Sequence, residues 1–226
     1  MILKMTKLEA IWGKAYFLFQ FFLLPWLLAL GSTYLPIPLS DSALNAILFF
    51  INFLAVWGIF HKFLWHSLKY AVKRPVDTLI AAGMGFGIYY LGNILVSYLI
   101  LFLSPDFFNV NDSNIAGMAR ENYLLVALCV VVLVPVVEEV FYRGLFFGRI
   151  YSQNKRAGYF ISVLFFAFIH IAGYIGLYDW KTLGLCLIQY IPAGIGLAFA
   201  YQKSQTIWTS VLIHALVNLT GILAMR

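Results

Sequence analysis

Five ionisable side chains lie within segments of this chain that are otherwise strongly apolar. They are Glu138, Glu139, Arg143, His170 and His214. A charged side chain at the centre of a bilayer costs roughly 2.5–3.5 kcal/mol on an insertion scale, so residues retained there are candidates for function. A carboxylate together with two imidazoles can accept and donate protons, which indicates acid–base chemistry.

Activation of water for hydrolysis is one reaction that suits this set of side chains. Glu138 could act as the general base, while imidazole and amide groups stabilise the oxyanion that forms from a carbonyl. Asn218 supplies such an amide one helical turn after His214. Alternatively, Glu138, His170 and His214 could bind a catalytic zinc ion with an open position for water. The expected cofactor is therefore either none or a divalent metal such as zinc, and both alternatives hydrolyse an amide or ester.

The two adjacent glutamates are expected to have different roles, because neighbouring positions on a helix point about 100° apart. Glu139 and Arg143 are four residues apart with the acid first, which is the favourable order for an ion pair. We therefore assign Glu139 and Arg143 to structural support of the site and expect Glu138 to face a cavity. Phe166 lies one turn before His170 and is expected to pack beside it.

The elements that must position these residues are membrane-spanning helices. The chain has 226 residues, of which 63% are hydrophobic and 11% charged, against about 25% charged in an ordinary soluble domain. A helical span needs roughly 20 apolar residues. Seven segments qualify, at residues 15–31, 43–60, 77–103, 123–147, 158–177, 182–201 and 206–224. We predict an all-α polytopic membrane protein with about seven transmembrane helices around a central cavity, forming a single integral domain over residues 1–226.

Two sequence features predict local helix geometry. Pro135 lies three residues before Glu138 and removes one backbone hydrogen bond, so it should kink the fourth span near the site. Gly83 and Gly87 have the GxxxG spacing that lets two membrane helices approach closely.

The distribution of basic residues predicts the orientation of the chain. The net charge is +6, and Lys and Arg are concentrated before the first span and after the second, fourth and sixth. This positive-inside pattern puts the N-terminus in the cytoplasm and Arg226, after seven spans, outside. Residues 61–75 alternate apolar and basic side chains, which predicts an amphipathic helix at the cytoplasmic interface. The basic charge thus reports topology, so the lipid bilayer, and no nucleic acid, is the expected partner.

This topology brings the costly side chains to similar depths. At 1.5 Å per residue, Glu138 and His170 lie about 16 and 18 Å from the cytoplasmic ends of their spans. His214 lies about 12 Å in and Asn218 about 18 Å. Three separate spans, the fourth, fifth and seventh, therefore place these residues in one layer on the cytoplasmic side of the bilayer centre.

The spacing of these residues resembles a known family of membrane peptidases. The segments EEVFYR, FAFIH and HALVN fit the patterns EExxxR, FxxxH and HxxxN, in that order, of the CAAX protease and bacteriocin-processing (CPBP, or Abi) family. The resemblance covers about residues 120–226, the motif-bearing peptidase core. It implies that Glu138, His170, His214 and Asn218 hold and activate the hydrolytic water. It also implies that Glu139 and Arg143 support the site, in a fold of helices around a conical cavity.

The resemblance also implies a substrate class and a location. Family members include enzymes that cleave prenylated CAAX proteins and compact prokaryotic proteins of peptide processing or bacteriocin self-immunity. The expected function is therefore an intramembrane endopeptidase acting on a membrane-associated peptide or protein, in a prokaryotic plasma membrane. One alternative is a non-catalytic immunity or scaffold protein. Another, a proton-coupled transporter, would show an inverted repeat with paired broken helices, and none is evident in the sequence.

Overall fold

Seven long helices make up most of the molecule. The computed structural model describes residues 4–36 and 38–225, and these contain seven helices long and apolar enough to cross a membrane. The spans are α1 (Lys7–Leu18) continued through η1 (Phe19–Leu23) into α2 (Leu24–Ser32), α3 (Asp41–Ile59), α5 (Pro75–Leu103), a composite fourth span, α10 (Lys155–Ala172), α11 (Trp180–Ser204) and α12 (Ile207–Ala224). No β-strand occurs within the described ranges. The predicted all-α polytopic fold is confirmed.

Side-chain caps set where several spans begin. The side chain of Ser40 accepts a hydrogen bond from the backbone of α3, as those of Asn154 and Asp179 do for α10 and α11. The fifth span ends at Ala172, so the predicted end at residue 177 is wrong. The chain forms turns after Ala172, and within them Gly176 has φ of 86°, a left-handed conformation that cannot continue a helix.

The fourth span is interrupted around Pro135. It consists of α7 (Tyr123–Leu128), η2 (Cys129–Leu133), α8 (Val134–Glu139), η3 (Val140–Phe147) and α9 (Gly148–Tyr151), where η marks π-helical turns. In η2 the backbone N–H of Val134 bonds to the carbonyl of Cys129. In the same register, the next hydrogen bond would run from the N–H of residue 135 to the carbonyl of Val130, but Pro135 has no N–H. The predicted disturbance of the helix therefore takes the form of a π-helical turn with one released carbonyl.

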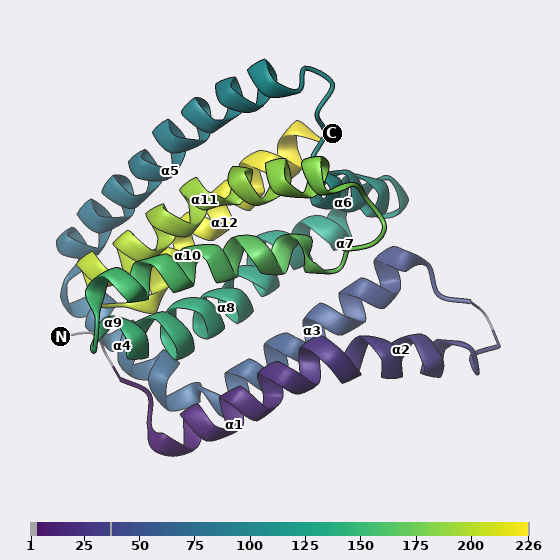
Figure 1. Ribbon diagram of the computed structural model, residues 1–226. Helices are drawn as coiled ribbons and strands as arrows, with labels where there is room; N and C mark the ends of the chain where they lie inside the picture. Colours follow the sequence, from purple (N-terminus) through teal and green to yellow (C-terminus); the bar gives the residue numbers. More distant parts are fainter. Residues whose placement is uncertain (1–3, 37, 226) are drawn as a thin grey trace.

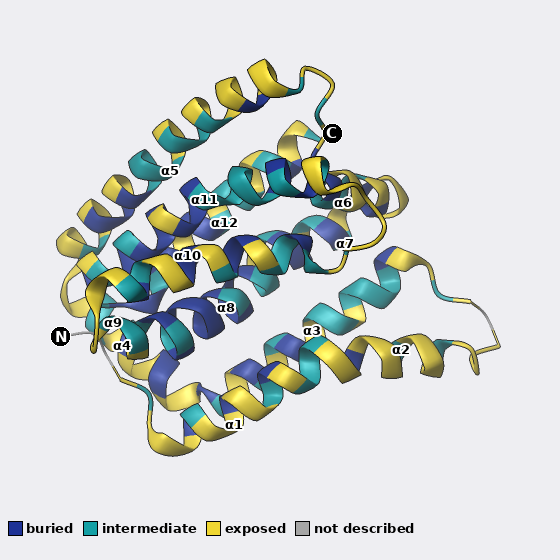
Figure 2. Ribbon diagram, in the orientation of Figure 1, coloured by how far each residue is buried: buried dark blue, intermediate teal, exposed yellow. Residues whose placement is uncertain are grey.

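The spans differ greatly in how much of their surface other helices cover. Figure 2 shows α8 largely buried and α5 largely exposed along its length. Figure 1 shows α1, α2 and α3 forming a long hairpin along one side of the bundle. The composite fourth span is thus held between this hairpin and the remaining helices, which is where its ionisable side chains can be shielded from lipid.

Helices α5 and α11 approach closely through glycines, but not through the predicted pair. A Cβ placed on Gly85 would lie 2.7 Å from the Cβ of Ala200, and one on Gly196 would lie 2.5 Å from the carbonyl oxygen of Gly85. At Gly83 and Gly87, a Cβ would meet nothing within 4 Å. The expectation for Gly83 and Gly87 was therefore wrong, because these residues face away from the contact.

Two shorter helices lie at opposite ends of the bundle. α4 (His61–Lys73) is the predicted amphipathic segment and lies near the N-terminal end of the chain (Figure 1). α6 (Val110–Glu121) lies at the other end, where the sequence predicted only a loop. The predicted position of Arg226 lies outside the described residues.

Candidate active site

A cavity of about 920 Å³ lies inside the bundle and contains the predicted site. Its lining includes Glu138 of α8, His170 of α10, and His214 and Asn218 of α12. All four side chains that the resemblance implies to hold water therefore line the same cavity.

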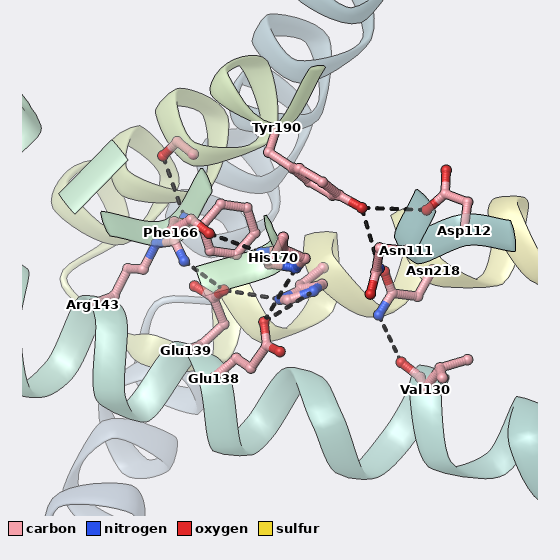
Figure 3. Close-up of polar contacts among 12 residues, drawn as sticks. Asn111, Asp112, Val130, Glu138, Glu139, Arg143, Phe166, His170, Tyr190 and Asn218 are labelled. Carbon is pink, nitrogen blue, oxygen red and sulfur yellow. Dashed lines mark hydrogen bonds and ion pairs between the residues drawn. The ribbon is translucent and has the colours of Figure 1, made fainter. Parts of the chain in front are cut away.

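Glu138 faces both histidines. Its Oε2 atom lies 3.9 Å from Nε2 of His170 and 3.9 Å from Nε2 of His214. Figure 3 shows Glu138 beside His170. The same Oε2 atom is buried and has no hydrogen-bond partner among the described residues. Both separations exceed a direct hydrogen bond. The carboxylate oxygen and the two ring nitrogens therefore lie around one small space, and the oxygen makes no direct hydrogen bond to either nitrogen.

Both imidazoles are oriented through their other ring nitrogen. Nδ1 of His170 lies 2.8 Å from the carbonyl oxygen of Phe166, and Nδ1 of His214 lies 2.9 Å from Oε1 of Glu139. Both partners are acceptors, so each Nδ1 carries the hydrogen. In the neutral rings, the lone pair of Nε2 is then directed toward Glu138.

Glu139 and Arg143 form the predicted ion pair, at 2.9 Å, and both side chains are fully buried. The guanidinium also donates to the carbonyl of Gly194 at 3.4 Å and lies 4.4 Å above the ring of Phe166. The carboxylate oxygen that binds Arg143 is the one that accepts from His214. Glu139 therefore does more than cancel charge, because it fixes the direction of a histidine. No residue spacing predicts that contact, because it joins α8 to α12.

Phe166 packs against both histidines. Its ring centroid lies 4.6 Å from that of His170 and 5.8 Å from that of His214. Asn218 points elsewhere, because its Nδ2 donates to the carbonyl of Val130 at 2.7 Å (Figure 3). This is the carbonyl released by the proline in the fourth span, so the amide replaces the missing backbone donor.

The cavity also contains a second polar group, which was not predicted from the sequence. Asn109, Asn111 and Asp112 at the start of α6 surround the hydroxyl of Tyr190 of α11. Burial raises the pKa of the Asp112 carboxyl, while the Tyr190 hydroxyl and the charge of His170 act in the opposite direction. The run NVNDSN at residues 109–114 is rich in the residues that cap helices, and could have predicted α6.

The donor types of the site match a catalytic zinc set, but their spacing does not. Zinc bonds of about 2.0–2.1 Å in a tetrahedron put two ligand atoms about 3.3 Å apart, whereas Glu138 lies 3.9 Å from each histidine nitrogen. Within the described residues, no group of three His, Cys, Asp or Glu side chains could hold a metal ion. The arrangement of Glu138, His170 and His214 therefore does not fit a bound zinc ion.

Comparison with known proteins identifies the core of the chain. Residues 120–220 match the family described as type II CAAX prenyl endopeptidase Rce1-like. This match covers the EExxxR, FxxxH and HxxxN motifs, which supply Glu138, His170, His214 and Asn218 to the cavity lining. The family resemblance that the motifs predicted is thus confirmed for residues 120–220, which are similar to this family of CAAX proteases.

Individual relatives are bacterial. The UPF0177 protein YaiF of Lactococcus lactis subsp. lactis (strain IL1403) is 30% identical over 121 residues, which cover 51% of this chain and 50% of that protein. The UPF0177 protein YxdF of the same strain is 26% identical over 130 residues, covering 57% and 67%. "Putative membrane peptidase YdiL" of Bacillus subtilis (strain 168) is 29% identical over 86 residues, covering 37% and 30%. The chain thus spans only half of YaiF. No solved structure matches the chain.

Proposed function

We propose that this protein is an intramembrane endopeptidase in which Glu138, assisted by His170 and His214, activates a water molecule. The observation that carries the proposal is the position of Glu138 Oε2, 3.9 Å from Nε2 of each histidine within the cavity. An oxygen atom can lie about 2.8 Å from two atoms 3.9 Å apart, so one water molecule can bond to the carboxylate and to an imidazole.

The reaction follows from these three groups. Glu138 removes a proton from the water, and the oxygen of that water attacks the carbonyl carbon of the peptide bond. The resulting tetrahedral intermediate collapses when the carbon–nitrogen bond breaks, and Glu138 returns the proton to the leaving amine. The histidines hold the water in line by accepting a hydrogen bond from it at Nε2. Asn218 acts indirectly, because it holds the helix around Pro135 in the conformation that directs Glu138 into the cavity.

The lining of the cavity supports a peptide as the substrate. Carboxamide side chains can both donate to and accept from a peptide main chain. The lining carboxamides are Gln20, Asn45, Asn52, Asn93, Asn109, Asn111, Asn114, Gln189 and Asn218. The substrate we propose is a membrane-associated peptide or protein, cleaved on the cytoplasmic side of the bilayer centre.

The proposed setting is a bacterial plasma membrane with the N-terminus in the cytoplasm. The basic residues before the first span and in the loops at that end support this orientation, and the relatives from Lactococcus and Bacillus support the bacterial membrane. We propose that residues 1–226 form one integral domain with the peptidase core at about 120–226.

The test compares purified variants in proteoliposomes with a library of candidate peptides. Glu138→Gln keeps the shape of the side chain but cannot act as a base, so kcat should fall by about 10²–10⁴-fold. His170→Ala should also lose activity. Asp106→Asn changes an exposed acid outside the cavity and should match the wild type. Equal product from all four proteins would refute the proposal, and full biological activity of Glu138→Gln would favour a non-catalytic immunity or scaffold role.

Elemental analysis and chelation decide between the two forms of water activation. The separations of 3.9 Å around Glu138 predict that activity persists after treatment with a strong chelator. The opposite result would be one zinc ion per chain before treatment, together with a loss of activity that added zinc restores. It would show that a metal held by Glu138, His170 and His214 activates the water.

A further inference from the structure

His170 is held by aromatic rings as well as by its hydrogen bond. Its ring is stacked on that of Tyr190, with centroids 4.2 Å apart and planes inclined by 28°. Phe166 makes a tilted contact at 4.6 Å. A single hydrogen bond from Nδ1 fixes one atom of an imidazole and leaves the ring able to rock about it. The stacked tyrosine restricts that motion, because the ring cannot turn without losing the contact.

The orientation of Tyr190 is itself fixed by α6. Its hydroxyl accepts from Nδ2 of Asn111 at 3.1 Å. Oδ1 of Asn109 lies 3.2 Å away and Oδ1 of Asp112 lies 3.4 Å away, and the single hydroxyl hydrogen serves one of these acceptors at a time. The polar end of Tyr190 thus has partners on several sides, while its ring faces His170 (Figure 3).

The start of α6 is a rigid anchor for this hydroxyl. Oδ1 of Asn109 caps the helix by accepting from the backbone of Asn111 and Asp112. Nδ2 of Asn109 donates to Oε1 of Gln189, the residue before Tyr190 on α11, at 2.9 Å. Two neighbouring residues of α11 are therefore tied to one turn of α6, so the tyrosine cannot move independently of that helix.

We propose that Tyr190 is a positioning residue, which holds His170 so that Nε2 points at Glu138 and the activated water. The proposal rests on the endopeptidase function proposed above. Neither the EExxxR, FxxxH and HxxxN motifs nor the spacing of the ionisable residues includes Tyr190. Displacement of a reacting group by about 1 Å can cost about 10²-fold in rate, so loss of this contact should affect the chemical step more than substrate binding.

Three substitutions separate the ring from the hydroxyl. Tyr190→Leu removes both, and we expect kcat to fall about 10–100-fold while KM stays within about threefold. Tyr190→Phe keeps the stacked ring and should restore most of kcat. Tyr190→Met is a second ringless variant with the same expectation as leucine, for use if the leucine variant does not fold. Tyr159→Leu removes a half-buried tyrosine of α10 far from His170 along that helix and should leave kcat unchanged.

Nuclear magnetic resonance of ¹⁵N-labelled histidine provides a readout independent of turnover. The wild type and Tyr190→Phe should show His170 as a single tautomer with the hydrogen on Nδ1. The ringless variants should show a mixture of tautomers, because a ring without the stacking contact makes the hydrogen bond from Nδ1 to Phe166 only part of the time. An unchanged tautomer with unchanged kcat in a folded ringless variant would overturn the proposal, as would a loss confined to KM, which would make Tyr190 a substrate contact.

Parallel measurement of Glu138→Gln keeps the two proposals apart. If the wild type is no more active than Glu138→Gln, the endopeptidase function itself fails. If the wild type is active, Glu138→Gln is inactive and both ringless variants of Tyr190 keep full kcat, the positioning role alone fails.

Discussion

The two adjacent glutamates have different contacts, because neighbouring positions on a helix point in different directions. Glu138 is directed into the cavity, while Glu139 is directed between helices, where it binds Arg143 and His214. The i, i+4 spacing predicted the first of these Glu139 contacts. Contact with His214 could not be predicted, because it depends on how α12 is rotated against α8.

Substitution of Arg143 tests how strongly the fold depends on this buried ion pair. Arg143→Met would leave the carboxylate of Glu139 buried without its cation, which should destabilise the fold by about 3–5 kcal/mol. The double variant Glu139→Gln/Arg143→Met should recover part of that loss, because no charge is then left unpaired. Unfolding of the detergent-solubilised protein by denaturant measures both. Arg149→Met, at an exposed position of α9, is the control, and an equal effect of Arg143→Met and Arg149→Met would contradict the account.

At the scale of elements, hydropathy predicted the seven spans but not the irregularities within them. The π-helical turns of the fourth span and the bond from Asn218 to Val130 depend on a register shift that apolar content does not encode. Helix α6 was missed because it is short and polar, so no hydropathy signal marks it. Its contacts with Tyr190 could not be predicted, because they depend on how α6 packs against α11.

The packing of α5 on α11 predicts unequal effects for two neighbouring glycines. Gly85→Ala would force a Cβ to within 2.7 Å of Ala200 and 2.8 Å of the Gly196 carbonyl, so the helices must separate and thermal stability should fall by several degrees. Gly83→Ala meets nothing within 4 Å and should be neutral or slightly stabilising. Melting temperatures in detergent compare the two, and a larger loss for Gly83→Ala would contradict the packing described.

For the whole molecule, the charge distribution predicts which end of the bundle faces the cytoplasm. α4 and α9 lie at the end where the chain begins, and α6 lies at the other (Figure 1). Basic residues are concentrated at the first of these ends. We therefore expect Ser152 to face the cytoplasm and Asp106 the outside.

Single cysteines at these two exposed positions test the orientation. A membrane-impermeant maleimide should label Asp106→Cys in intact cells and Ser152→Cys only after permeabilisation. The native Cys129 and Cys186 are both buried, which keeps the background low. The reverse labelling pattern would show that the bundle is inserted the other way round.

Under the proposed function, side chains from α8 and α10 act as one hydrolytic centre with those of α12. A double-mutant cycle on kcat/KM with Glu138→Gln and His170→Ala measures this most directly, because residues that act as a unit have strongly non-additive effects. We predict that the double variant is about as slow as Glu138→Gln alone. A double variant slowed by the product of the two separate effects would show that Glu138 and His170 act independently, and would contradict the single centre.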